Sequence, residues 1–302
     1  MTGSGFSWNL LADIRSLWAF QFMVNAFRAG AIVAVVAGVM GWFMVLRRQA
    51  FAGHTLALAA FPGAAGATLI GVSAVYGYFA FCLGAAVIIA AAARGRRSAG
   101  SLAAESALTG TVQAFTLACG LLFVALYKGF LNGTTALLFG SFLGITNGQV
   151  AVLAATGVAV LAAVAVLGRP LLFASVDPDV AAARGVPVRA LSVVFLVLLG
   201  AAVAQTAQIT GALLVFALLV MPAATAQRLT ARPLASLVLT VVVGWAVTWA
   251  GLVAAYYSAY PIGFYVTTFA FGAYLAAHLA AAAQHRLRRR AAPAQAPAQA
   301  PA

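Results

Sequence analysis

Charged residues are scarce in this 302-residue chain, since 7% of the residues are charged and 65% are hydrophobic. A soluble domain carries about a quarter charged residues, so this composition excludes a water-soluble enzyme. Acid-rich metal cages and paired-carboxylate hydrolases are also excluded, because the chain has only four acidic residues. These are Asp13, Glu105, Asp177 and Asp179. With a mean hydropathy of +1.05, the composition indicates a polytopic membrane protein.

Cysteine and lysine are equally rare. Cys82 and Cys119 both lie inside apolar runs, so neither a disulfide framework nor a thiolate metal site is expected. Lys128 is the only lysine, and no glycine-rich phosphate-binding loop ending in Lys-Ser or Lys-Thr is present. Neither a His-Glu-x-x-His sequence nor a Ser/His/Asp set can be assembled. We therefore expect no enzyme activity and no cofactor bound by this chain, and any ATP would be hydrolysed by another polypeptide.

Long apolar runs are what the sequence has in abundance. A transmembrane helix needs about 17 to 25 predominantly apolar residues. Nine such runs predict an all-α transmembrane bundle, with eight or ten spans as alternatives because two pairs of runs are joined tightly. The expected spans are 29–46, 57–75, 77–93, 108–127, 150–168, 190–206, 211–226, 235–256 and 262–283.

The basic residues orient these spans, because cytoplasmic loops carry an excess of Lys and Arg. If the first span ends in the cytoplasm at Arg47 and Arg48, alternation of nine spans places 14 of the 17 Lys and Arg residues inside. This sorting predicts an outside N-terminus and an inside C-terminus. The net charge of +13 is then explained by cationic cytoplasmic loops rather than by binding to nucleic acid.

The segments flanking the predicted transmembrane domain, 29–283, have a different composition. Residues 1–28 mix aromatic and polar side chains, which suits a helix lying at the membrane interface. Residues 284–302 are basic and then rich in Ala, Pro and Gln, so a disordered cytoplasmic tail is expected. No cleavable signal peptide is expected, since no basic segment leads directly into a short apolar run.

Two of the spans carry a proline next to small residues, at Pro62 and Pro222. In many transporters, interrupted helices at corresponding positions of two halves line the substrate path. The predicted topology makes these two spans antiparallel, as inverted repeats require, although plain structural kinks are the alternative. Polar residues at membrane depth are a second group of path candidates, unless they only form a tight turn. This group comprises Gln205, Thr206, Gln208 and Thr210.

Three stretches together resemble the permease subunit of bacterial zinc and manganese ABC importers. Residues 44–63 resemble the family sequence VLRRxxFxGDxLSHxxxPG, and residues 170–186 resemble PLLFxSFDPExAxxxG. Residues 211–226 resemble GxLLVxALLxxPAATA. Their order, spacing and predicted topology agree with the family from about residue 28 to residue 283.

The longest predicted inward loop, 169–190, contains a short helix signal. Asp177 suits the N-cap, Pro178 the first turn, and Gly185 the position after the end. In the family this segment is the coupling helix that docks on the ATPase, while a plain connection between spans is the alternative. The resemblance assigns coupling to Asp177, Pro178, Asp179, Ala183, Arg184 and Gly185.

The first stretch departs from the family at two positions implied in metal passage. The family's Asp position is His54 here, and its His position is Leu58. An imidazole suits zinc, and the loss of a carboxylate disfavours manganese, which prefers oxygen ligands. His54 is therefore a candidate metal ligand, unless it is an ordinary capping or interface residue. If the interior site is weak, Gln208, Thr210 and Asn132 would supply modest polar contacts and a binding protein would supply specificity.

The resemblance implies a permease in a prokaryotic cell membrane, present as a homodimer. Its implied partners are an ATP-binding subunit and an extracytoplasmic metal-binding protein, which would dock on the outward segment 128–149. The divalent metal is then a substrate, with zinc favoured over manganese. The alternatives are a permease for a chelated metal or another solute, a passive channel, and an intramembrane enzyme.

Overall fold

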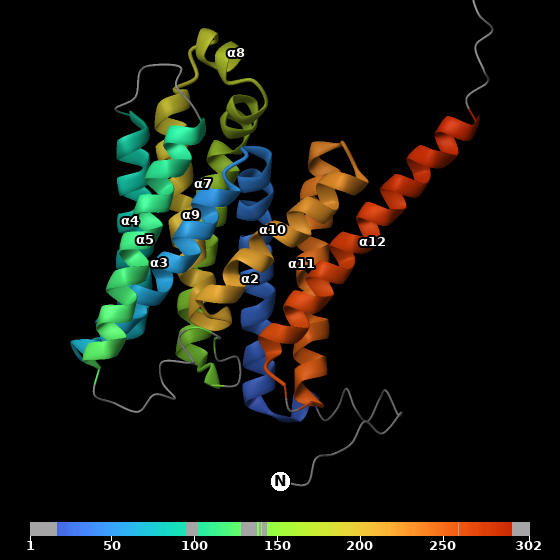
Figure 1. Ribbon diagram of the computed structural model, residues 1–302. Helices are drawn as coiled ribbons and strands as arrows, with labels where there is room; N and C mark the ends of the chain where they lie inside the picture. Colours follow the sequence, from blue (N-terminus) through green and yellow to red (C-terminus); the bar gives the residue numbers. More distant parts are fainter. Residues whose placement is uncertain are drawn as a thin grey trace, which may run out of the picture.

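The structure is a computed structural model that describes residues 17–94, 102–127, 138, 140, 144–258 and 260–291. In this described part, all regular elements longer than one turn are α-helices, and nine of them have 18 or more residues (Figure 1). The elements are α2 (Gln21–Leu46), α3 (Ala50–Leu69), α4 (Ala74–Arg94), α5 (Leu102–Leu126), α7 (Asn147–Val176), α8 (Pro178–Ala183), α9 (Val188–Thr210), α10 (Ala212–Leu229), α11 (Pro233–Tyr256) and α12 (Ile262–Ala291).

The all-α prediction is confirmed. Within the described residues, seven helices are long and apolar enough to cross a membrane: α2, α4, α5, α7, α9, α11 and α12. Helix α10 contributes a shorter apolar segment, Leu214–Leu229, and α3 is not among the seven. These two helices contain Pro62 and Pro222 and lie between other helices.

Four helices, α2, α3, α9 and α10, form the centre of the bundle, and each of them contacts the other three. On one side α4 packs against α3 and α9, and α5 packs against α3 (Figure 1). On the other side α11 and α12 pack against α10, and α11 also packs against α2. Helix α7 fills the groove between α2 and α9.

The contacts of helices α2–α5 recur among helices α9–α12. The pairs α3·α4 and α3·α5 correspond to α10·α11 and α10·α12, and the pair α9·α4 corresponds to α2·α11. This scheme makes α3 the counterpart of α10, so Pro62 and Pro222 lie in corresponding helices. The helices α2–α5 and α9–α12 therefore pack in two similar groups, and each group contains one of these prolines.

Glycines let the central helices approach closely, as small residues do in membrane proteins. A Cβ atom at Gly41 of α2 would collide with the backbone carbonyl of Leu219 in α10. Gly63 of α3 and Gly77 of α4 face each other in the same way, each against the other's carbonyl oxygen. The α2–α10 and α3–α4 contacts thus depend on the absence of side chains.

Three helices extend beyond the predicted spans. Helix α2 begins at Gln21, so residues 21–28 belong to the first helix, and the Asn25 amide anchors this end by donating to the Ile145 carbonyl at 3.0 Å. Helix α7 continues through Pro170 to Val176, so the first part of the predicted loop 169–190 is helical. Helix α12 continues to Ala291 and includes the basic start of the predicted tail. Its Ala, Leu, Gln and Arg residues are strong helix formers, and cations favour a helix C-terminus.

Parts of three predictions lie outside the described residues. They are 1–16 of the interfacial segment, 292–302 of the tail, and most of the outward segment 128–149, including Lys128 and Asn132.

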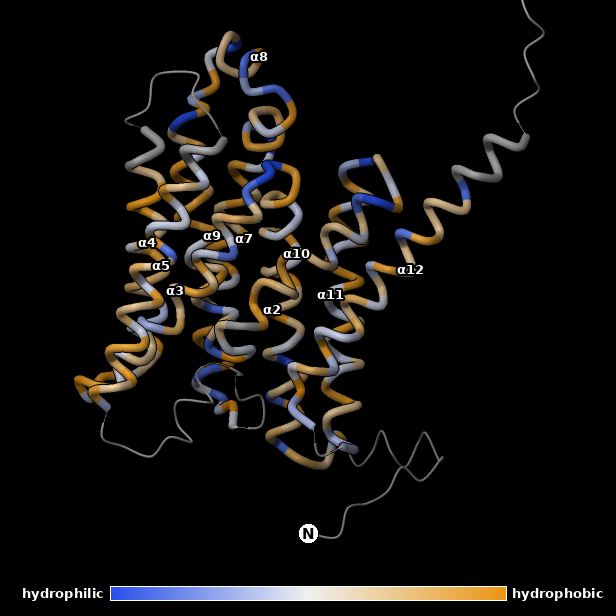
Figure 2. Tube along the Cα trace, viewed as in Figure 1, coloured by the Kyte–Doolittle hydropathy of each residue, from blue (hydrophilic) through white to orange (hydrophobic). Residues whose placement is uncertain are grey.

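Cationic residues gather at the end of the bundle that carries α8. Helices α2 and α10 end there, and α9 and α11 begin there (Figure 1), next to hydrophilic positions of the chain (Figure 2). Arg28 lies in the second turn of α2, toward the other end. The cations near these helix termini are Arg47, Arg48, Arg184, Arg189, Arg228 and Arg232.

Replacing Gly41 by Ala tests the close approach of α2 and α10. We expect the free energy of unfolding to fall by about 1–3 kcal/mol, the usual effect of overpacking, because backbone atoms must move. The matched control is Gly84→Ala in α4, where an added Cβ meets nothing within 4 Å and Ala favours the helix. Denaturant unfolding in detergent micelles measures both variants, and equal effects would contradict the packing described.

Candidate functional site

The short helix predicted at residues 177–185 is confirmed as α8. The Asp177 side chain caps it by accepting a hydrogen bond from the backbone N–H of Val180 at 3.0 Å, and Pro178 occupies the first turn. Gly185 follows the end of the helix with φ +80°, a conformation that favours glycine.

Helix α8 offers a small exposed surface at one end of the bundle (Figure 1). Only Ala181 faces inward and is buried, whereas Val180 is 46% exposed. The other coupling candidates, Pro178, Asp179, Ala183, Arg184 and Gly185, are exposed, and Asp177 is half-buried by its capping role. A partner protein can therefore contact α8 directly.

Helices α2 and α3 are joined by a tight turn close to this surface. The backbone N–H of Gln49 donates to the Met44 carbonyl, and that of Arg48 donates to the Val45 carbonyl. Arg48 has φ +58°, so the turn is a Schellman motif with arginine where glycine is usual. Gly53, at the start of α3, packs directly on the Met44 sulfur.

His54 lies in the second turn of α3 and is half-buried. Its ring contacts the ring of Phe216 in α10 edge-on, with 4.8 Å between the centroids. Nδ1 is buried, and within the described part of the chain it has no hydrogen-bond partner. Gln49 is the N-cap residue of α3, so His54 does not cap this helix.

His54 belongs to no cluster of metal-binding side chains in the described part of the chain. Among the described residues, no three His, Cys, Asp or Glu side chains are close enough to hold a metal ion together. Leu58, four residues further along α3, shares a face with His54 but supplies no donor atom. Any metal contact at His54 would thus involve one imidazole, water and backbone oxygens, which suits brief passage better than tight storage.

The polar path candidates lie in the last turns of α9. Gln205 is fully buried, and its amide donates to the Leu153 carbonyl of α7 at 3.0 Å. Its carbonyl oxygen has no hydrogen-bond partner within the described residues. Thr206 and Thr210 donate to carbonyls of their own helix, and so does the half-buried Gln208. Gln205 therefore holds the one unused buried acceptor of this group.

The prolines and the end of α9 occupy different places in the bundle. Pro62 packs next to Gly120 of α5, and Pro222 packs near Gly244 of α11. Thr210 is followed by Gly211, whose φ of +72° allows α9 and α10 to be joined by one residue. This junction packs on Gly140 of the outward segment.

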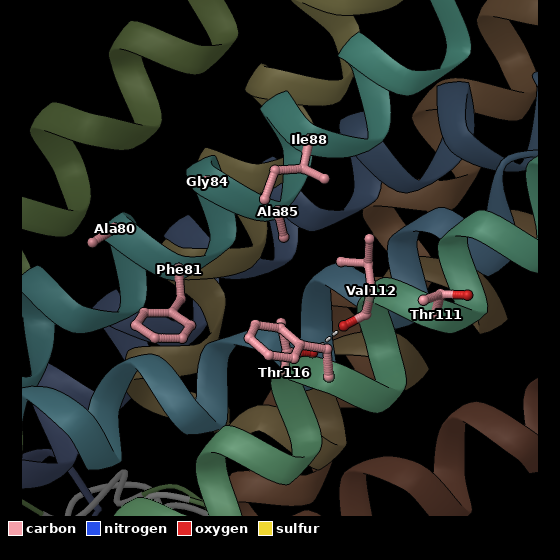
Figure 3. Close-up of a pocket in the computed structure, with 9 residues that line it drawn as sticks. Ala80, Phe81, Gly84, Ala85, Ile88, Thr111, Val112 and Thr116 are labelled. Carbon is pink, nitrogen blue, oxygen red and sulfur yellow. Dashed lines mark hydrogen bonds between the residues drawn. The ribbon is translucent and has the colours of Figure 1, made fainter. Parts of the chain in front are cut away.

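A cavity of about 430 Å³ lies away from these residues, between α4 and α5 (Figure 3). Its polar groups include the Thr111 and Thr116 hydroxyls, which donate to carbonyls of their own helix. Ile88 and Phe115 at its border are 55% and 70% exposed, so the cavity opens on the outer apolar surface. None of the sequence candidates lines it, and it offers a cation no charged ligand.

Sequence reasoning used Arg47 only to orient the spans and did not single out Phe216. The guanidinium of Arg47 lies among side chains of α7 and α9. A cation that directly follows an apolar run predicts a helix end, but it does not predict these partners.

An apolar helical bundle with cations and one exposed short helix at the same end has the architecture of a multi-pass membrane permease. Residues 19–281 of the chain match a family described as "ABC 3 transport family". The chain therefore belongs to the ABC 3 transport family and is a multi-pass membrane permease of a bacterial ABC importer.

Known relatives support this assignment. The manganese transport system membrane protein MntC of Halalkalibacterium halodurans is 30% identical over 78% of this chain and 79% of its own length. The high-affinity zinc uptake system membrane protein ZnuB of Haemophilus influenzae is 25% identical over 76% and 83%. The solved structure of PsaBC from Streptococcus pneumoniae in complex with Fab matches with a TM-score of 0.78 and 26% identity. That match covers 89% of this chain and 95% of the PsaBC chain.

Removing the cap of α8 should loosen this helix. We expect Asp177→Ala to speed amide hydrogen exchange at residues 178–186 roughly fivefold, because a lost N-cap costs about 1 kcal/mol. Asp177→Asn keeps an acceptor oxygen and is the matched control, with exchange close to that of the wild type. Equal acceleration in both variants would show that the carboxylate charge matters and the cap does not.

Proposed function

We propose that this chain forms the path by which a divalent metal cation, with zinc favoured over manganese, enters a prokaryotic cell. Membership of a family of metal ABC importers carries the proposal. The relatives named above include proteins named for manganese and for zinc. The imidazole at position 54, where the family has a carboxylate, favours zinc for this chain.

The path is proposed to run between the four central helices. Candidates on three of them support this route: His54 and Pro62 on α3, Gln205, Gln208 and Thr210 on α9, and Pro222 on α10. Helices α3 and α10 meet at His54 and Phe216. A single exchangeable imidazole there would contact the cation without trapping it, so specificity would rest largely on the extracytoplasmic binding protein.

The proposed membrane arrangement has nine crossings, with the N-terminus outside and the C-terminus inside. The nine long helices of the described part and the cations at the α8 end support it. In this orientation α8 faces the cytoplasm, where residues 177–185 would dock on the ATP-binding subunit. Two copies of the chain would form the complete path, each with its own ATPase contact.

Metal content of cells tests the proposed substrate. A strain lacking the gene, grown with zinc or manganese limiting, should show a zinc deficit that the wild-type gene restores. His54→Ala should restore less than half of the deficit, because it removes the imidazole. His54→Asp, which installs an oxygen donor, should shift the restored metal toward manganese.

The matched control is His278→Ala, a histidine of α12 next to Tyr274 and outside the central helices. It should restore zinc fully. Full restoration by His54→Ala would assign His54 to the scaffold, and a deficit of neither metal would refute the divalent-cation substrate.

A further inference from the structure

Arg47 is a partly buried cation whose partners carry no negative charge. Nη2 donates to the Ser192 hydroxyl at 2.7 Å, Nη1 to the Ser175 hydroxyl at 3.2 Å, and Nε to the Gln49 side chain at 3.4 Å. The guanidinium also lies over the Phe195 ring, 5.1 Å from its centroid. Burial lowers the pKa of Arg47 from its ordinary value, but a guanidinium stays protonated in proteins.

The two serines lie on either side of the coupling helix. Ser175 is in the last turn of α7, Ser192 is in the second turn of α9, and α8 lies between them in sequence. Each hydroxyl gives its own proton to a carbonyl of its helix, at Leu171 and at Val188. Their lone pairs are therefore available to the guanidinium, whose planar fork can bond both serines at once.

On its other side, Arg47 is continuous with the turn that starts α3. The Schellman hydrogen bonds and the contact of Gly53 with Met44 leave this turn little freedom. One turn further along α3, His54 meets Phe216 of α10, and Thr55 bonds Gln113 of α5 at 3.1 Å. Direct contacts thus connect the Arg47 side chain to the central helices.

A purely stabilising role explains this arrangement poorly. Removing a cation from water is costly, and apolar residues of similar size often stabilise a buried site as well or better. An apolar side chain at the end of α2 could not form hydrogen bonds with serines on two other helices.

We propose that Arg47 is a positioning residue that connects movement of α8 on the ATPase to movement of α3 at the metal path. This inference rests on the proposed function, because it requires that α8 contact the ATPase and that α3 line the path. Arg47 touches neither ATP nor metal. Its loss should separate ATP hydrolysis from transport.

The test uses proteoliposomes containing the chain with its ATP-binding subunit and metal-loaded binding protein. Radioactive zinc or manganese uptake and ATP hydrolysis are measured in the same vesicles, which gives metal ions transported per ATP. Arg47→Met should lower this ratio by at least about fivefold, the lower end of typical coupling between linked sites, with ATP hydrolysis within about twofold of wild type. Arg47→Lys should give a ratio between those of the wild type and Arg47→Met, because the lysine ammonium lacks the planar array of donors of a guanidinium.

The matched control is Arg48→Met, the exposed neighbour in the same turn, which should leave the ratio unchanged. If Arg47→Met does not assemble, Ser192→Ala removes the shortest contact alone and should also lower the ratio. If the assembled Arg47→Met variant transports as many metal ions per ATP as the wild type, the proposed role of Arg47 is wrong. Metal uptake by the wild type would still support the proposed function. Wild-type vesicles that transport neither metal would instead refute the proposed function and this inference with it.

Discussion

The cost of burying polar groups in an apolar bundle is the constraint on which this structure depends, because such groups are stable there when they have partners within the protein. Threonine hydroxyls of α9, α10 and α11 satisfy this by bonding carbonyls of their own helix. Arg47 cannot do so, and Asp177 and Asp179 lie in the cap and first turn of α8. Its positive charge is instead shared among serine hydroxyls, an amide and a ring, and this connects three helices at one point.

Glycines let neighbouring helices of the bundle pack with their backbones in direct contact. Helices α2 and α10 touch backbone to backbone at Gly41, and α3 and α4 do so at Gly63 and Gly77. Since α2–α5 and α9–α12 repeat one contact scheme, a shift of α3 against α10 occurs where the two halves meet. The corresponding positions of Pro62 and Pro222 put a helix irregularity on each side of that boundary.

Local signals predicted much of this arrangement. The cap at Asp177, the glycine after α8 and the apolar runs depend on residues close in sequence, and the structure confirms the short helix and the all-α fold. Helices α7 and α12 extend beyond the predicted spans, because helix propensity continues past the apolar stretch. The pairing of His54 with Phe216 and of Arg47 with Ser192 joins residues far apart in sequence, so no spacing rule could predict it.

In the proposed orientation α8 faces the ATPase side of the membrane, and the α11–α12 connection faces the other side. Single cysteines at Val180, 46% exposed, and Tyr260, 67% exposed, test it directly in a chain with Cys82 and Cys119 replaced by Ala. An impermeant maleimide is applied to oriented membrane vesicles lacking the ATP-binding subunit. Val180→Cys should react only in inside-out vesicles and Tyr260→Cys only in right-side-out vesicles. Reaction of both positions from one side, or the reverse pattern, would contradict the account.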